Sequence, residues 1–194
     1  MSDVSAQPSH AVEPLAQDAI AVRLSAEQIQ ARIAEMACEI NAAYAGCQRL
    51  TLIAILKGSF LFLADLARHL TMPCQIEFVR LASYGDQTRS SGAVKPVDLT
   101  LPNLENADVL IVEDIMDTGL TLRFFMEYLR SLHHTRSLKL AVLLDKPETR
   151  SEEARHLSID FCGFTVQNEF LVGYGLDYAG LYRNLPFVGV LPTP

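Results

Sequence analysis

The sequence predicts an α/β protein built on an open, mostly parallel twisted sheet flanked by helices. Short apolar runs rich in β-branched residues alternate with segments of helical periodicity, as in strand–helix–strand units. The apolar runs are almost unbroken by polar residues, which is typical of strands buried on both faces of a parallel sheet. No internal repeat or low-complexity tract favours a different architecture.

The first helix and the first buried strand have clear boundaries in the sequence. A helix is expected over residues 26–44, where apolar residues recur at helical spacing. Ser25 is placed to cap this helix, and Gln28, three residues later, completes the pattern of a capping box. Gly46 marks the end of the helix. The apolar run at residues 50–56 is expected to form the first buried strand.

The remaining elements continue the alternation of strands and helices. In chain order we expect a helix at residues 60–70, a strand at 75–81, an edge strand at 97–100, a buried strand at 108–112, a helix at 118–132, a strand at 138–144, and short strands at 159–163 and 188–191, with an apolar segment at 170–172 between them. The polar stretch at 82–96 lacks apolar periodicity, and internal loops of this length are often functional lids. We therefore expect a mobile loop there.

The composition limits the classes of function. The chain has 194 residues, of which 49% are hydrophobic and 20% charged, enough for a sizeable core. We expect one domain over residues 18–194, preceded by a loosely ordered extension at 1–17. The net charge of −7 disfavours nucleic acid as a partner. No stretch approaches the roughly 20 apolar residues of a membrane span, and the first residues lack the features of a secretory signal, so we expect no membrane partner and a cytoplasmic location.

Charged residues follow three of the predicted strands. Lys57 and Lys146 each follow one strand, and the carboxylates of Glu113, Asp114 and Asp117 follow another. Ligands of open parallel sheets bind beyond the carboxyl ends of the strands. These side chains are therefore expected to share one site.

The residues after the buried strand at 108–112 indicate a site for a sugar and a phosphate. The neighbouring acids Glu113 and Asp114 would repel each other unless a cation or sugar hydroxyls bound there. The helix expected to follow would offer backbone N–H groups to a phosphate, and the hydroxyls of Thr118 and Thr121 would add donors. Glycine at position 119 would let the backbone approach the ligand closely.

Residues 109–121, VLIVEDIMDTGLT, resemble the signature of the type I phosphoribosyltransferases, in which an apolar strand and two acids precede an Asp-Thr-Gly-x-Thr phosphate loop. The resemblance implies the fold of that family, with a small hood formed by the chain termini. It implies that Glu113 and Asp114 face the ribose hydroxyls of 5-phosphoribosyl 1-pyrophosphate. The residues implied to hold the 5-phosphate are Asp117, Thr118, Gly119, Leu120 and Thr121. Leu120 departs from relatives that carry Lys there, but it keeps its backbone N–H.

Two further segments resemble the hypoxanthine-guanine branch of this family. Residues 56–59, Leu-Lys-Gly-Ser, resemble its pyrophosphate loop, so Lys57 and Gly58 are implied to contact pyrophosphate. The Lys-Gly peptide of that loop is often cis, which makes Lys57-Gly58 the candidate for a cis bond. Ser83 and Tyr84 open the long polar segment and resemble the start of the mobile loop that closes over the donor.

Two blocks imply the purine-binding residues. Residues 143–150, LLDKPETR, resemble the segment whose lysine reads the 6-oxo group of the purine, so Lys146 is the candidate for specificity. Residues 168–186, NEFLVGYGLDYAGLYRNLP, resemble the C-terminal block of the same branch. There Phe170 is implied to stack on the purine, and Leu171 to meet its edge through the backbone.

The C-terminal block also implies the pyrophosphate and metal contacts. Asp177 is implied to hold Mg²⁺, the expected cofactor, on the pyrophosphate, and Arg183 to contact the pyrophosphate. Glu113 and Asp114 are further candidate ligands of the metal.

The implied reaction is purine salvage, in which hypoxanthine or guanine displaces pyrophosphate to give IMP or GMP. Asp117 is the candidate base for the proton at purine N7. A homodimer or homotetramer is implied, paired through the strand at 50–56 and its following helix. Three alternatives stay open: a xanthine-preferring transferase, a non-enzymatic regulator on the same fold, and a phosphoacceptor receiver domain. The receiver domain is disfavoured because no acid pair ends the first strand.

Overall fold

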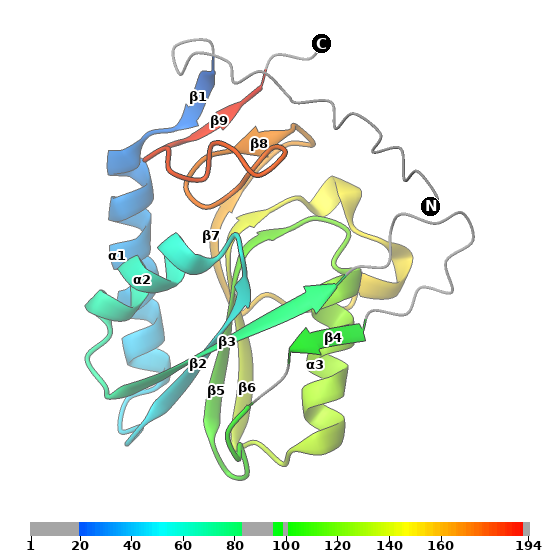
Figure 1. Ribbon diagram of the computed structural model, residues 1–194. Coiled ribbons are helices and arrows are strands. Elements are labelled where there is room, and N and C mark those ends of the chain that lie inside the picture. The colour runs from blue at the N-terminus through cyan, green and yellow to red at the C-terminus, as the bar shows by residue number, and fades with distance from the viewer. Residues whose placement is uncertain (1–19, 83–94, 99–100, 192–194) are drawn as a thin grey trace, which may run out of the picture.

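The central sheet has six strands in the order β4-β3-β2-β5-β6-β7 in the computed structural model, which describes residues 20–82, 95–98 and 101–191 (Figure 1). The strands are β2 (Leu50–Leu56), β3 (Cys74–Ala82), β4 (Lys95–Asp98), β5 (Asp108–Met116), β6 (Ser137–Asp145) and β7 (Phe161–Thr165). All neighbours pair in parallel except β4, which runs antiparallel to β3 at one edge. The predicted open, mostly parallel sheet is confirmed. The expected extension at 1–17 and the loop residues Ser83 and Tyr84 lie outside the described residues.

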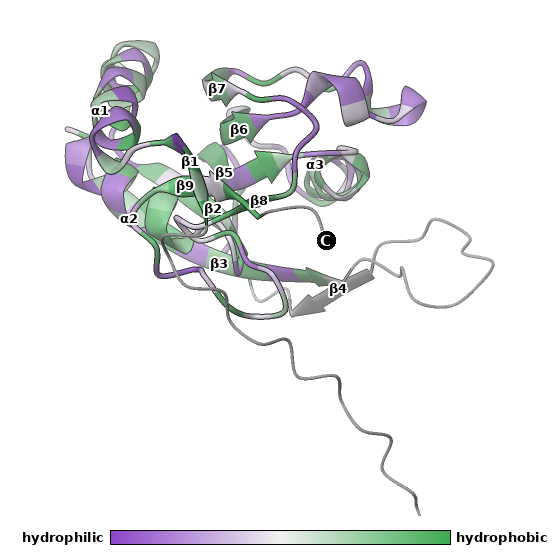
Figure 2. Ribbon diagram, turned by 90° about the horizontal axis from the view of Figure 1, so that it is seen from above, coloured by the Kyte–Doolittle hydropathy of each residue, from purple (hydrophilic) through white to green (hydrophobic). Residues whose placement is uncertain are grey.

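Helices cover both faces of this sheet, as Figure 2 shows from above. They are α1 (Ala26–Ala43), α2 (Phe60–His69) and α3 (Leu120–Leu132). The described residues also include the 3₁₀ helices η2 (Pro147–Thr149) and η3 (Glu152–Ala154). α1 and α2 pack with Leu52 and Val112 on one face of the sheet, and α3 packs with Ile53 and Ile111 on the other. No helix of the described part of the chain is long and apolar enough to cross a membrane.

A second, three-stranded antiparallel sheet forms the hood that was expected from the two ends of the chain. Its strands, in spatial order, are β1 (Ala21–Leu24), β9 (Val188–Val190) and β8 (Leu171–Val172). In Figure 1 this sheet lies above the carboxyl ends of the central strands. The sequence does not predict β1, because its four residues are mostly exposed and lack an apolar alternation.

One boundary that differs from the prediction matters for the site. β5 continues to Met116, so Glu113 and Asp114 lie within the strand and not after it. Pairing with β6 includes Glu113 opposite Val142 and resumes after Asp114 with Ile115 opposite Leu144. The backbone pairing therefore outweighs the low strand propensity of the two acids.

The start of α3 also differs from the prediction. The helix begins at Leu120, because Gly119 occupies the N-cap position with a left-handed φ of 75°. β4 begins two residues earlier than predicted and β7 two residues later, while the other predicted elements agree within one residue at each end. The capping box of α1 is confirmed, since the side chains of Ser25 and Gln28 each accept from the backbone N–H of the other.

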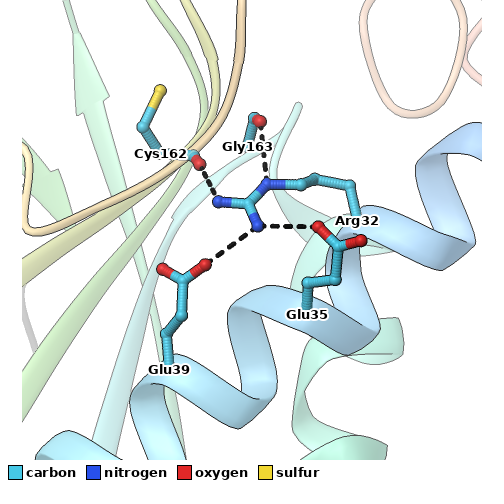
Figure 3. Close-up of polar contacts among 5 residues, drawn as sticks. All are labelled: Arg32, Glu35, Glu39, Cys162 and Gly163. Carbon is cyan, nitrogen blue, oxygen red and sulfur yellow. Dashed lines mark hydrogen bonds and ion pairs between the residues drawn. The ribbon is translucent and has the colours of Figure 1, made fainter.

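Arg32 links α1 to β7, which forms the edge of the central sheet opposite β4. Its guanidinium donates to the carbonyl oxygens of Cys162 at 2.8 Å and Gly163 at 3.0 Å (Figure 3). Glu35 and Glu39 accept from its remaining nitrogen, each at 2.9 Å. Edge strands expose unpaired backbone groups, and here a charged side chain covers two carbonyls. The contact holds the strand that leads into the predicted purine-binding segment.

Candidate active site

The two acids of β5 point to opposite faces of the central sheet. Side chains alternate along a strand. Ile111 belongs to the apolar cluster under α3, and Val112 to the cluster under α1 and α2. Glu113 lines the hollow beside the start of α3, whereas Asp114 lies against Gly58 in the loop that leads into α2. The two acids predicted to bind ribose therefore border different parts of the site.

A hollow of about 230 Å³ lies on the α3 face, where β5 leads into α3. Residues from β2, β3, β5 and the start of α3 line it. The predicted site residues among them are Glu113, Asp117, Thr118, Gly119 and Thr121. Leu120 is 40% exposed and is not part of the lining. The structure thus brings two of the motif's three acids and both threonine hydroxyls together around one cavity, whereas Asp114 is not part of the lining.

The first turn of α3 lies beside this hollow. N–H groups of a first turn have no partner within the helix and attract anions. A Cβ on Gly119 would lie 2.8 Å from Cβ of Ala154 and 2.9 Å from Cε of Met116, so a side chain does not fit. The backbone N–H of Ser151 donates to the carbonyl oxygen of Thr118 at 3.0 Å. The close packing of Gly119 and the hydrogen bond from Ser151 therefore fix the loop before α3 in a conformation that suits a phosphate.

Glu113 carries a buried acceptor. Its Oε2 atom is buried and has no hydrogen-bond partner among the described residues. Desolvation and the neighbouring charge of Asp114 raise the pKa of Glu113 well above its usual value. An acceptor of this kind is satisfied when a hydroxyl group or a cation binds beside it. Asp117 is exposed on the same hollow.

On the other face, Asp114 is buried against the backbone of the loop that follows β2. A Cβ on Gly58 would overlap the carboxyl group of Asp114, so only glycine fits. A Cβ on Gly175, which has a φ of 99°, would lie 2.0 Å from the carbonyl oxygen of Gly58, so a side chain does not fit there either. Burial raises the pKa of Asp114 to about 6, while backbone hydrogen bonds and the charge of Arg183 act in the opposite direction. The β2 loop, Asp114 and the C-terminal block therefore meet here.

The cis peptide bond of this loop precedes Lys57. Leu56-Lys57 is cis, so the expectation of a cis Lys57-Gly58 bond is wrong by one residue. Lys57 is exposed, whereas Gly58 is buried. The need for glycine at position 58 comes from its contact with Asp114 and not from a cis bond after Lys57.

The predicted pyrophosphate and metal residues of the C-terminal block pair with each other beside the loop. Arg183 forms an ion pair with Asp177 at 2.6 Å. It also donates to the carbonyl oxygen of Gly175 at 2.6 Å. The charges of both side chains act on Asp114, so all three ionisable groups lie in one neighbourhood.

The predicted purine-binding residues lie between β6 and the hood. Lys146 is buried, and its Nζ donates to the carbonyl oxygen of Glu169 at 2.7 Å. Phe170 is 55% exposed and meets Tyr178 edge-on, with 5.5 Å between the ring centroids. Leu171 is buried in β8. An ammonium with further donors near an exposed aromatic ring suits a planar base that carries a carbonyl oxygen.

Sequence reasoning does not identify Glu169, Gly175 or Tyr178 as part of this arrangement. Glu169 contributes a backbone carbonyl, which no side-chain pattern reveals. Gly175 is required by a close approach of two distant backbone segments. The spacing of glycines around Tyr174 is a signal for such an approach, although it does not show which segment approaches.

The Phosphoribosyl transferase domain model matches residues 24–179. The chain belongs to this family. A hypoxanthine-guanine phosphoribosyltransferase of Mycobacterium avium is 44% identical over 95% of this chain and 91% of the relative. Its counterpart in Bacillus subtilis is 42% identical over 88% of this chain and 92% of the relative. The crystal structure of a hypoxanthine-guanine phosphoribosyltransferase from Bacillus anthracis has a TM-score of 0.81 and 40% identity, covering 88% of this chain and 98% of that chain.

This phosphoribosyltransferase is therefore a transferase enzyme. Membership of the family excludes the receiver domain, and the kinship to purine-salvage enzymes favours catalysis over the non-enzymatic regulator. The resemblance carried by residues 109–121 is confirmed at the level of the family.

Proposed function

We propose that this phosphoribosyltransferase salvages purines by joining the phosphoribosyl group of 5-phosphoribosyl 1-pyrophosphate to N9 of hypoxanthine or guanine. The observation that carries the proposal is the buried ammonium of Lys146, held beside the segment that presents Phe170. An ammonium can donate to the 6-oxo group of these bases but would face the amino group of adenine unfavourably. The names of the relatives from Mycobacterium avium and Bacillus subtilis support the same substrates.

The donor is proposed to lie across the ends of β5 and β2. Its 5-phosphate would rest on the first turn of α3, where helix N–H groups favour an anion. Its ribose hydroxyls would donate to Glu113 and Asp114, and the unpartnered oxygen of Glu113 supports this assignment. Its pyrophosphate would be held by Lys57, the backbone of Gly58, and Arg183.

In the proposed reaction the bond between C1 of the ribose and the pyrophosphate oxygen breaks, and its electron pair leaves with the pyrophosphate. N9 of the purine forms the new bond to C1. Positive charge grows on the ribose, and the carboxyl groups of Glu113 and Asp114 favour it. The proton at purine N7 passes to Asp117, which is exposed on the hollow. We expect Asp117→Asn to lose roughly 10²-fold or more in turnover, and near-normal turnover would refute its role as base.

Mg²⁺ is the cofactor that we propose, with Asp177, Glu113 and Asp114 as candidate ligands. Across the described residues, no group of three or more His, Cys, Asp or Glu side chains is gathered to hold a metal ion. Mg²⁺ is usually bound through one or two carboxylates together with substrate phosphates, so the phosphates of the donor would complete the site. When bound, it would neutralise charge on the leaving pyrophosphate.

A spectrophotometric assay with hypoxanthine, guanine, xanthine and adenine tests the proposal. We expect Mg²⁺-dependent turnover of hypoxanthine and guanine and none of adenine. A clear preference for xanthine would favour the xanthine-preferring alternative. Absence of turnover with all four bases would refute the proposal.

A homodimer or homotetramer in the cytoplasm is part of the same proposal. Exposed apolar side chains support such an assembly: Phe60 at the start of α2 is 38% exposed, and Ile76 and Phe78 on β3 are 44% and 49% exposed. Exposed large apolar residues that share a face often mark an interface between proteins. Light scattering after size exclusion tests this, and a monomer at micromolar concentration would contradict it.

A further inference from the structure

Tyr174 occupies an unusual place in the turn between β8 and Asp177. Its side chain is buried, with 4% exposure, and its backbone φ is 48°. Gly173 and Gly175 on either side have φ values of 93° and 99°. A bulky residue with positive φ is uncommon and persists where surrounding contacts hold it in place. Hydrogen bonds of the Tyr174 hydroxyl group are among these contacts.

The hydroxyl of Tyr174 donates to Oδ2 of Asp65 in α2. Gln30 of α1 donates to the same oxygen at 2.6 Å, and Arg68 pairs with the other oxygen of this carboxyl group. Desolvation and the hydrogen bond to Asp65 raise the pKa of Tyr174, so the hydroxyl keeps its proton. The hydroxyl of Tyr174 also accepts from Gln30 at 3.5 Å. It therefore ties the turn to a carboxyl group that two helices hold.

Both ends of this hydrogen bond lie next to groups proposed to hold pyrophosphate. Gly175 directly follows Tyr174, and its carbonyl oxygen accepts from Arg183. A Cβ added to Gly175 would lie only 2.0 Å from the carbonyl oxygen of Gly58. On the helix side, α2 carries Asp65 and begins directly after the loop that contains Gly58. The hydrogen bond thus links α2, which follows the Gly58 loop, to the turn next to Gly175, and both segments are proposed to bind the pyrophosphate.

We propose that Tyr174 and Asp65 are positioning residues, whose hydrogen bond sets the separation between Gly58 and Arg183 across the pyrophosphate. The inference rests on the proposed function, because it takes the pyrophosphate site from there. Neither residue is placed on the substrate, so their effect is indirect.

The purine pocket is held by other contacts. Lys146 is bonded to the carbonyl oxygen of Glu169, and Leu171 is fixed by the pairing of β8 with β9. Loss of the Tyr174 hydroxyl should therefore weaken binding of the pyrophosphate groups and leave binding of the base unchanged. This selectivity separates a positioning role from a general loss of stability.

The test compares Tyr174→Phe with Tyr44→Phe. Tyr44 is also buried, with 5% exposure, and its hydroxyl donates to the carbonyl oxygen of Val109 at 3.3 Å, away from the predicted site. Each variant removes the hydroxyl of one buried tyrosine, with its hydrogen bonds to Asp65 and Gln30 in one case and to Val109 in the other. Asp65→Asn and the double variant Tyr174→Phe with Asp65→Asn complete a mutant cycle.

For Tyr174→Phe we expect KM for the donor, and KM for pyrophosphate in the reverse reaction, to rise about tenfold, equal to about 1.4 kcal/mol. KM for hypoxanthine should stay within about twofold, and Tyr44→Phe should change none of the three constants. The double variant should be no worse than the more severe single variant.

Equal effects of Tyr174→Phe and Tyr44→Phe in a folded, active enzyme would overturn the inference, as would additive effects in the cycle. Failure of the unmodified enzyme to use any purine would instead refute the proposed function. Thermal unfolding of every variant confirms that the constants compare folded proteins.

Discussion

Gly119→Ala tests the proposed phosphate site at the start of α3 most sharply, because the cost of the new methyl group can be worked out from the structure. The φ of 75° at Gly119 costs a residue with a side chain roughly 1–2 kcal/mol in unfolding free energy. The new Cβ would also lie 2.8 Å from Ala154 and 2.9 Å from Met116, where ordinary contacts begin at 3.4 Å. The loop must therefore shift by about 0.5 Å.

A 1 Å misplacement at an active site can cost about 10²-fold, so half that shift predicts a loss of about tenfold in kcat/KM for the donor. Gly46→Ala is the matched control, because Gly46 has a φ of 81° but a Cβ added there would meet no atom within 4 Å. In urea both variants should lose the cost of the positive φ, and Gly119→Ala should lose more because of its close contacts. Only Gly119→Ala should lose activity. Equal kcat/KM values for the two variants in steady-state assays would refute the reasoning.

Three further predictions concern charge and stacking. Burial raises the pKa of Asp114 to about 6, so its contribution to stability is present below pH 4 and is lost as the pH rises through 6. Asp114→Asn should therefore raise the unfolding free energy at pH 7 by about 3 kcal/mol, with a much smaller gain in urea titrations at pH 4. The hydrogen bonds from Arg136 lower the pKa of Asp108, so its contribution is present above pH 4 and is lost as the pH falls further. Asp108→Asn should cost about 1–3 kcal/mol at pH 7, and a deficit that persists unchanged at pH 2 would contradict this. Phe170→Ala should raise KM for the purine about tenfold and leave KM for the donor unchanged, because base stacking on an aromatic ring contributes about 1–3 kcal/mol.

The sequence predicts the central sheet well because its strands are buried on both faces. The apolar run at 50–56 is strand β2 with both ends correct, since burial requires apolar side chains at every position. β1 escapes prediction because its four residues form a strand only by pairing with β9 from the far end of the chain. Local patterns carry no information about such a distant partner.

The same distinction between local and distant information applies to the candidate site. Glu113, Gly119 and Thr121 are predicted from one contiguous motif and line one hollow in the structure. The link between Asp65 and Tyr174 joins residues 109 positions apart, and neither residue stands out in its own segment. Side-chain chemistry can be inferred locally, whereas the contacts that position it depend on how distant segments meet.

The central claim is that Lys146 selects a 6-oxopurine for transfer to the donor. The most direct measurement supplies the donor, Mg²⁺ and an equimolar mixture of hypoxanthine, guanine and adenine, and identifies the nucleotides formed by mass spectrometry. We predict IMP and GMP without AMP, a loss of this preference in Lys146→Gln, and no change in Lys139→Gln, whose lysine pairs with Asp160 on the surface. Formation of AMP as readily as IMP by the unmodified enzyme, or an unchanged preference in Lys146→Gln, would contradict the account.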